Sequence, residues 1–280
     1  MKRLFDFILS HSIFIAFCAA ALSLQTLQLL QLPVNWYLLV FIFFATLGGY
    51  NAYWMTSKIS FNRYSSARIF LQQNTRSFLV MLAAVVGMLY SFARLHLVMY
   101  NIIFTGVLLG LYAIPVMPFK PLRFKWKAGF VKTLLLAFAW AIVTVLVPLQ
   151  ISVLKMGHGQ LTLFINRFLF MLMLCIVFDK RDAAVDKIRG LQSLATDIKP
   201  GHLNYITGII FIAYCCNCYL LMNYNISAWQ VTALLVTGLV ALIVYLLSFK
   251  KRGYIFYYFV ADGLMFLSPL LTGLAGMITT

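Results

Sequence analysis

Residues 160–186 read QLTLFINRFLFMLMLCIVFDKRDAAVD, a long apolar run that leads directly into a group of acidic residues. Between positions 160 and 178 the only charged side chain is Arg167, and a helix of this length crosses the ~30 Å hydrocarbon core of a membrane. Asp179, Asp182 and Asp186 follow at i, i+3, i+7 spacing, which places them on one face if the helix continues. The stretch predicts a membrane span whose end presents a group of carboxylates.

Acidic residues are rare in the rest of the chain. There are six in total, none of them glutamate, and four lie between positions 179 and 197. Like charges four residues apart destabilise a helix unless something neutralises them. A hard cation such as Mg²⁺, with phosphate oxygens in its remaining coordination positions, is one such neutraliser. The other is pairing with the neighbouring cations, which are Lys180, Arg181, Lys187 and Arg189. The spacing alone leaves both alternatives open.

The composition is that of a polytopic membrane protein. Hydrophobic residues make up 63% of the chain and charged residues 10%, whereas a soluble domain is roughly half apolar. We expect an all-α bundle of nine transmembrane helices in a single membrane domain, residues 1–280, with no soluble domain. The predicted spans are residues 8–30, 35–54, 77–93, 96–117, 128–150, 160–178, 204–223, 228–248 and 254–277.

The net charge of +16 has a one-sided distribution. Of the 22 Lys and Arg residues, all but Arg94, Lys155 and Arg167 fall at the N-terminus or around the loops after the second, fourth, sixth and eighth spans. This is the positive-inside pattern, so we expect these segments to face the cytoplasm, with the inner membrane of a bacterium as the expected location. The basic charge would there meet anionic membrane lipids or a phosphorylated substrate, and not nucleic acid.

The layout of the loops predicts an internal duplication. The two long polar loops, residues 55–76 and 179–203, both face the cytoplasm and lie four helices apart. We therefore expect two similar four-helix halves plus a ninth helix. Inverted repeats, which are common in transporters, would put matching features on opposite sides of the membrane. The pattern favours a single cytoplasm-facing site over alternating access.

A third cytoplasmic loop combines prolines with cations. Pro115, Pro118 and Pro121 end the fourth helix and hold an extended turn, which carries the cations Lys120, Arg123, Lys125 and Lys127. One interpretation is anchoring to anionic lipid, at about 1 kcal/mol per cation. The other is a cradle for a diphosphate group. Neither is excluded by the residues themselves.

Two segments resemble a known family. DAAVDKIRGLQSLA, residues 182–195, is similar to the second aspartate motif of the UbiA-type membrane prenyltransferases, which has D-x-x-x-D, a glycine four residues later and a Ser/Thr-Leu pair. LGLYAIP, residues 109–115, with Lys120 after it, is similar to the G-x-x-Y-S-x-P…K segment of that family. The expected helix number, the cytoplasmic face and the duplication agree with the same resemblance.

The first motif of that family, N-D-x-x-D, is altered. Residues 51–55 read NAYWM, which keeps Asn51 and lacks both aspartates, and Lys58, Arg63 and Arg68 follow. Two alternatives remain open. The cations contact a diphosphate directly where the family uses a metal, or the chain has lost catalysis.

The resemblance implies transfer of an isoprenyl group from a prenyl diphosphate to an acceptor, of which aromatic, quinone-type compounds are one class. It implies Mg²⁺ held by Asp179, Asp182 and Asp186, with Asp182, Asp186 and Lys120 as the catalytic residues. The implied substrate-binding residues are Asn51, Lys58, Arg63, Tyr112, Arg123 and Arg189. The isoprenoid tail would lie in an apolar chamber between the helices.

Two ionisable residues lie deepest in the predicted spans. We expect one of two roles for Asp262. It acts as a base or polar contact for the acceptor, or its side chain forms a structural hydrogen bond to a Tyr or Ser. Arg167 lies near the outer end of its span, and we expect it to extend outward to the membrane surface. Two other functions remain open: a non-catalytic isoprenoid- or lipid-binding protein of the same fold, and a small-solute transporter.

Overall fold

A computed structural model describes residues 2–61, 70, 74–95, 99–113, 129–151, 155–189 and 193–279. The described part contains helices only. They are α1 (Lys2–Ser10), α2 (Ile13–Leu29), α3 (Trp36–Phe61), α5 (Thr75–Phe92), α6 (Met99–Ala113), α7 (Gly129–Ala141), the π-helix η3 (Ile142–Leu146), α8 (Val147–Leu149), α9 (His158–Arg189), α10 (Leu194–Asp197), α11 (Pro200–Leu221), the 3₁₀ turn η5 (Met222–Tyr224), α12 (Ala228–Leu247), the π-helix η6 (Phe256–Ala261) and α13 (Asp262–Thr279).

The chain is a multi-pass membrane protein. Within the described residues, 7 helices are long and apolar enough to cross a membrane, and α1 with α2 gives an eighth if this pair, bent by 65°, is one span. The apolar part of α6 is shorter, Met99–Leu111. The polytopic helical bundle is therefore as predicted, whereas the number nine and the division into two halves stay predictions.

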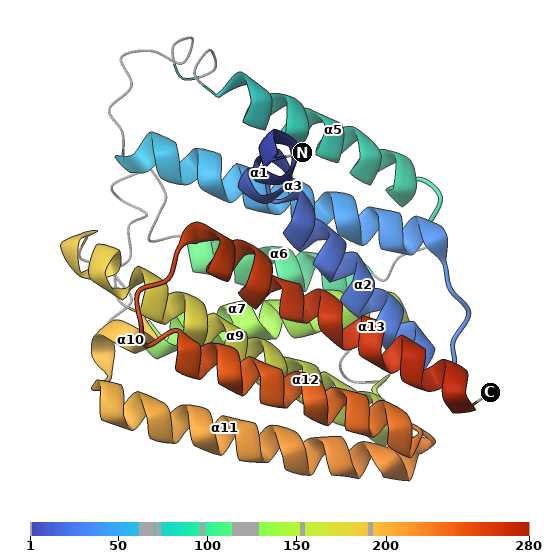
Figure 1. Ribbon diagram of the computed structural model, residues 1–280. Helices are drawn as coiled ribbons and strands as arrows, with labels where there is room; N and C mark the ends of the chain where they lie inside the picture. The colour runs from blue at the N-terminus through green and yellow to red at the C-terminus, as the bar shows by residue number, and fades with distance from the viewer. Residues whose placement is uncertain are drawn as a thin grey trace.

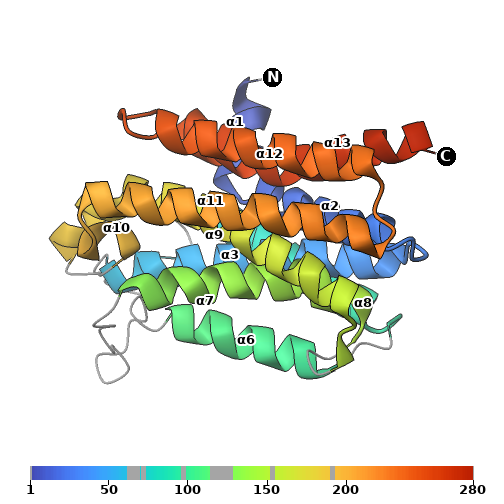
Figure 2. The same cartoon turned by 90° about the horizontal axis from the view of Figure 1, so that it is seen from below.

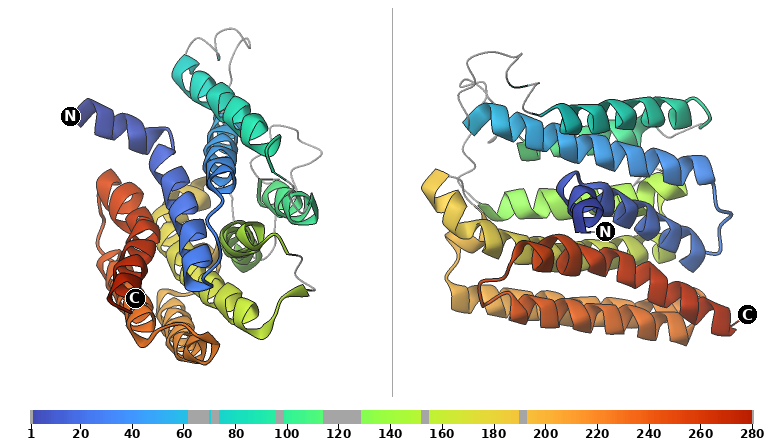
Figure 3. Two further views of the ribbon diagram at one scale, coloured as in Figure 1. Left: turned by 90° about the vertical axis from the view of Figure 1, so that its right-hand side faces the viewer. Right: turned by 45° about the horizontal axis from the view of Figure 1, so that its top comes forward.

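The helices lie side by side and alternate in direction across the molecule (Figures 1 and 2). In the end-on view of Figure 3, α9 lies among the other helices, and it is the most buried of the candidate spans. Every residue from Phe170 to Val177 is buried, which explains why this stretch is apolar on all sides. By contrast α5 exposes Leu82, Val86 and Leu89 on its outer face, as expected for a helix in contact with lipid.

Buried polar side chains join helices that are distant in the sequence. Arg167 Nη2 donates to Gln25 Oε1 at 2.7 Å and to the Leu22 carbonyl at 3.3 Å. Gln25 Nε2 in turn donates to Ser268 Oγ and Thr272 Oγ1, both at 2.9 Å. These bonds connect α9, α2 and α13. The expectation that Arg167 extends to the membrane surface is wrong, because its side chain is 4% exposed and bonds inward to another helix.

The bend between α1 and α2 lies beside α3. Ser12 has a left-handed backbone conformation there, with φ 61°. Asn51 Nδ2 donates to the His11 carbonyl at 2.9 Å and to the Leu47 carbonyl at 2.8 Å. The buried amide of Asn51 thus binds a carbonyl group that the bend leaves outside a helical ladder. The bend is therefore fixed against α3.

Candidate functional site

A cavity of about 320 Å³ lies between α2, α3, α7, α9 and the η6–α13 segment. It lies toward the ends of the bundle formed by the last turns of α3 and α9 and the first turns of α7 and η6, on the left in Figure 1. The lining combines charged residues, most of them from the end of α9, with apolar residues from deeper in the bundle. The charged lining residues are Lys132, Asp179, Arg181, Asp182, Asp186 and Asp262.

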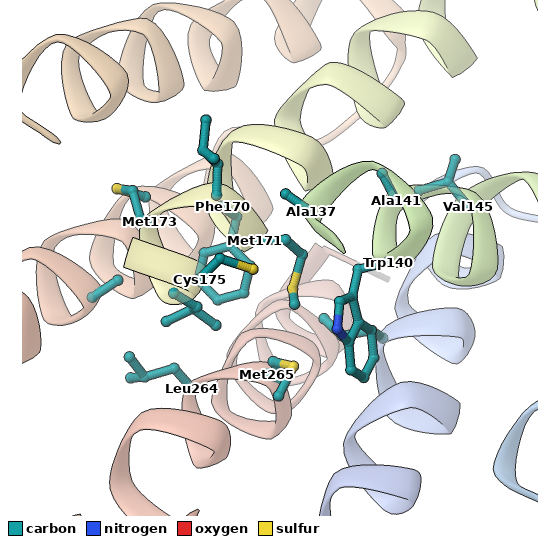
Figure 4. Close-up of a cluster of buried hydrophobic side chains, with 14 of the residues drawn as sticks. Ala137, Trp140, Ala141, Val145, Phe170, Met171, Met173, Cys175, Leu264 and Met265 are labelled. Carbon is teal, nitrogen blue, oxygen red and sulfur yellow. The ribbon is translucent and has the colours of Figure 1, made fainter. Parts of the chain in front are cut away.

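Side chains of α2, α7, α9 and α13 build the apolar wall. Figure 4 shows Trp140 of α7, Met171 and Cys175 of α9, and Met265 of α13 around one space. Phe14, Ile15 and further apolar side chains of α2, α7 and α9 extend this wall. Such a surface suits a hydrocarbon chain, because small-molecule sites are mostly apolar with a few polar groups that fix orientation.

The helical spacing brings Asp179, Asp182 and Asp186 into the cavity lining, since α9 continues unbroken to Arg189. Asp179 Oδ2 accepts a hydrogen bond from Thr133 Oγ1 of α7 and one from the Leu194 backbone N–H at the start of α10, at 3.3 Å. The Asp179 carboxylate therefore joins α9 to two other elements. Asp186 is buried, with 7% exposure.

Asp182 forms an ion pair with its neighbour in sequence. Arg181 Nε and Nη2 donate to Asp182 Oδ1 and Oδ2, each at 2.7 Å, which is the bidentate geometry of a strong charge-assisted pair. Of the two neutralisers considered for the acidic cluster, pairing with a cation is thus present for this carboxylate. The side chain of Asp182 is 44% exposed and that of Arg181 20% exposed.

Asp262 lies in the apolar part of the lining, at the first position of α13. Its side chain is 5% exposed. Tyr50 of α3 and Trp140 of α7 line the same cavity and carry the other polar groups of its apolar side. These residues give the inner part of the cavity one acidic group and two groups capable of hydrogen bonding.

Two predicted substrate-binding residues of α3 do not line this cavity. Asn51 is committed to the α1–α2 bend, although its neighbours Tyr50, Tyr53 and Trp54 are lining residues. Lys58 Nζ donates to Asn74 Oδ1 at 2.8 Å, so it bridges α3 to the residue before α5. Both side chains are thus used in contacts between helices.

The remaining predicted residues lie outside the described part of the structure. Arg63, Lys120 and Arg123 are not described, and neither are the side chains of Tyr112 and Arg189, although their backbones end α6 and α9. Their contacts with a substrate stay predictions.

Sequence reasoning did not single out Lys132, Thr133 or Arg181 as site residues. Lys132 and Thr133 lie in the first turns of α7, where Lys132 lines the cavity. The available signal was the position of Lys132 inside the apolar segment 128–150, because a cation in a span is a candidate for function. Arg181 was considered only as a partner for the aspartates.

Solved structures with a similar fold exist. An apo structure described as a UbiA homolog from Aeropyrum pernix K1 aligns with 97% of this chain and 98% of its own, with a TM-score of 0.60 and 16% sequence identity. The chain has the UbiA fold. A structure of digeranylgeranylglyceryl phosphate synthase aligns with 99% of this chain and 100% of its own, with a TM-score of 0.61 and 14% identity. No protein-family profile matches the sequence, and no curated protein sequence does. The UbiA resemblance read from residues 182–195 and 109–115 is thus confirmed for the fold.

The donor atoms in the cavity fit a Mg²⁺ ion bound by few protein ligands. Asp182 and Asp186 supply carboxylate oxygens one helical turn apart in the lining. Across the described ranges no three His, Cys, Asp or Glu side chains form one metal-binding group. Mg²⁺ is commonly held by one or two carboxylates, with phosphate oxygens and water in its other positions. This donor set suits that arrangement and not a closed protein cage.

Proposed function

We propose that the protein is a membrane prenyltransferase, which moves an isoprenyl group from a prenyl diphosphate to an acceptor. The observation that carries the proposal is a single cavity with carboxylates and cations at one end and an apolar wall at the other. A prenyl diphosphate has the same division between a charged head and an apolar tail. The UbiA fold supports the assignment, and the basic residues of the neighbouring loops support a cytoplasmic face for the charged end.

At the charged end Asp182 and Asp186 would hold Mg²⁺, while Asp179 keeps α9 joined to α7 and α10. When bound, Mg²⁺ would act as a Lewis acid that neutralises the charge gained by the leaving diphosphate. Lys132 adds a positive charge to the same lining, and Lys120, Arg123, Arg63 and Arg189 are the cations that the sequence supplies for the remaining phosphate oxygens.

The apolar wall would hold the isoprenoid tail and exclude water from the allylic cation that forms when the C–O bond breaks. Trp140, Tyr50 and Phe178 line the cavity, and aromatic faces stabilise a cation by about 0.5–2 kcal/mol each. On the same side, Asp262 would contact the acceptor. An aromatic, quinone-type acceptor or another hydroxyl compound offers the polar group that this carboxyl requires.

The test is transfer from radiolabelled prenyl diphosphate to acceptors in a membrane lipid extract, by the purified protein with and without Mg²⁺. We expect Asp182→Ala and Asp186→Ala each to lower transfer about 10²–10³-fold, the loss typical of removing one electrostatic stabiliser of the transition state. Asp197→Ala is the control, because Asp197 is exposed on α10 and does not line the cavity. Unchanged transfer in both cavity variants would contradict these roles.

The second candidate is a non-catalytic isoprenoid-binding protein of the same fold. Two observations favour it. Residues 51–55, NAYWM, lack the two aspartates of the related motif, and the carboxylate of Asp182 is already paired with Arg181. This candidate predicts that prenyl diphosphate binds but is recovered intact after long incubation with Mg²⁺ and lipid extract. Release of diphosphate from the bound donor would exclude it.

A further inference from the structure

The guanidinium of Arg181 lies in the cavity and is bound on one side only. Nε and Nη2 are directed to the Asp182 carboxylate, whereas Nη1 is buried without a hydrogen-bond partner in the described part of the chain. A buried donor without an acceptor destabilises the protein, and more so when it is charged. The cavity therefore contains a charged donor group that the protein does not satisfy.

Aromatic rings keep this guanidinium in place. The Cζ atom of Arg181 lies 4.9 Å from the ring centroid of Phe178, 5.5 Å from that of Tyr257 and 4.9 Å from that of Tyr258. Phe178 precedes it on α9, and the two tyrosines come from η6. Cation–π contacts of this kind hold an arginine side chain without using its hydrogen-bond donors. The donors remain available to a ligand.

The ion pair between Arg181 and Asp182 does little to hold the helices together. Arg181 and Asp182 are adjacent on one helix, so their ion pair joins no two elements of the bundle. The rings of η6 already connect Arg181 to the neighbouring segment. What the ion pair does change is the charge that an incoming ligand meets, because each partner masks the other.

Arg181 also adds positive charge to the described part of the cavity lining. The chain lacks the acidic pair that would hold further metal at residues 51–55. Besides Arg181, the one cation in the described lining is Lys132. An arginine stays charged at any physiological pH, and its planar fork matches two phosphate oxygens. It can therefore contribute permanently the positive charge that a metal would otherwise bring.

We infer that Arg181 binds the diphosphate of the donor directly, and that Asp182 holds its guanidinium only until the donor arrives. Diphosphate oxygens replace the Asp182 carboxylate on Nε and Nη2 and also take the free Nη1 donors. The released Asp182 would then be free to hold a divalent cation. No covalent bond changes in this exchange. The inference rests on the proposed function and names the residue that recognises the donor.

The exchange predicts whether Asp182→Asn strengthens or weakens the binding of pyrophosphate. In Asp182→Asn the competitor for Arg181 loses its charge, so inorganic pyrophosphate without metal should bind severalfold more tightly than to the wild type. With Mg²⁺ present the same variant loses a metal ligand and should bind pyrophosphate more weakly than the wild type. Arg181→Gln should weaken binding about tenfold or more under both conditions, the size expected for charged hydrogen bonds.

The measurement is isothermal titration calorimetry of inorganic pyrophosphate into the full-length protein in detergent micelles, with EDTA or with Mg²⁺. Arg94→Gln is the matched control, since Arg94 also lies over a tyrosine ring, Tyr90 at 5.9 Å, but is exposed and does not line the cavity. Its affinity should equal that of the wild type. Arg181→Lys keeps the charge without the fork and should fall between the wild type and Arg181→Gln.

The outcomes separate this inference from the proposed function. Weaker metal-free binding by Asp182→Asn, or wild-type affinity in Arg181→Gln, would overturn the exchange while leaving prenyl transfer possible. Absence of pyrophosphate binding to the wild type under both conditions would overturn the diphosphate site and the exchange together. If Arg181→Gln does not fold, the sign of the Asp182→Asn effect and the Arg181→Lys affinity still decide the matter.

Discussion

Asp262 is a carboxyl group placed in an apolar span, where burying an acid costs at least ~2.5–3.5 kcal/mol. One sequence-based alternative was a structural hydrogen bond to a Tyr or Ser side chain. No such bond is formed with any residue that the structure describes, and a weak side-chain contact reaches Asp262 from Cys18 Sγ, to its backbone carbonyl at 3.5 Å. Because the carboxyl faces the cavity, we interpret it as the acceptor-side residue.

Asp262→Asn should therefore separate donor binding from transfer. Asparagine has the same shape but accepts no proton, so we expect transfer to the lipid-extract acceptor to fall about 10²–10⁴-fold, as for loss of a general base. Inorganic pyrophosphate should still bind, because Asp262 is not among the residues proposed to contact the diphosphate. The two measurements are the labelled-donor assay and calorimetry.

The control for this variant is Asp6→Asn, which makes the same change at an exposed acid that does not line the cavity. Equal loss of pyrophosphate binding and transfer in Asp262→Asn would indicate a collapsed cavity. Full transfer activity would exclude a role for Asp262 in proton transfer.

Among the helices, one glutamine of α2 bonds to both α9 and α13. Gln25 accepts from Arg167 and donates to Ser268 and Thr272. Gln25→Leu would leave the buried guanidinium with the Leu22 carbonyl as its remaining acceptor in the described residues. We expect the free energy of unfolding to fall by about 1.5–3 kcal/mol, the typical value of hydrogen bonds to a charged group.

Thermal unfolding in detergent, followed by size-exclusion chromatography, measures this effect. Gln28→Leu makes the same change at an exposed position of α2 and should leave the unfolding temperature near that of the wild type. The double variant Gln25→Leu/Arg167→Leu should recover part of the loss, since it removes both the charge and its acceptor. A double variant less stable than Gln25→Leu alone would contradict this explanation.

The packing of α11 against α12 requires a glycine. A Cβ atom at Gly238 would overlap the ring of Tyr214, which is 1% exposed and donates its hydroxyl to the Leu234 carbonyl at 2.9 Å. Gly238→Ala should therefore lower the free energy of unfolding by about 1–3 kcal/mol, as overpacking commonly does. The same thermal assay tests it, with Gly208→Ala on α11 as control, because a Cβ there meets no atom within 4 Å. Equal stability of the two variants would contradict the predicted clash.

For the whole molecule, the sequence predicts what depends on local pattern. Apolar runs of span length mark the membrane helices, and the period of the helix brings Asp179, Asp182 and Asp186 into one lining. Both predictions use only the residues within each helix or next to it. The resemblance at residues 182–195 likewise pointed to the UbiA fold.

What the sequence did not predict depends on partners far along the chain. From its sequence position Arg167 is expected to extend to the membrane surface. Its hydrogen-bond acceptor Gln25 lies 142 positions away in the chain, so the sequence near Arg167 does not reveal it. Asn51 looks like a remnant of a metal motif, although its amide binds the His11 carbonyl across 40 positions. The position of Arg181 among three rings needs η6 to pack beside α9. The spacing of residues within one helix does not show which distant residues these side chains will contact.

The packing of α2 against α13, visible in Figure 1, has a consequence for biosynthesis. Gln25 enters the membrane early in translation, whereas Ser268 and Thr272 are added when nearly all other spans have been inserted. Until then the carboxamide of Gln25 has to stay within lipid or an insertase without its final acceptors. A nascent chain that ends before α13 would therefore lack the wall that Asp262 and Met265 give to the cavity.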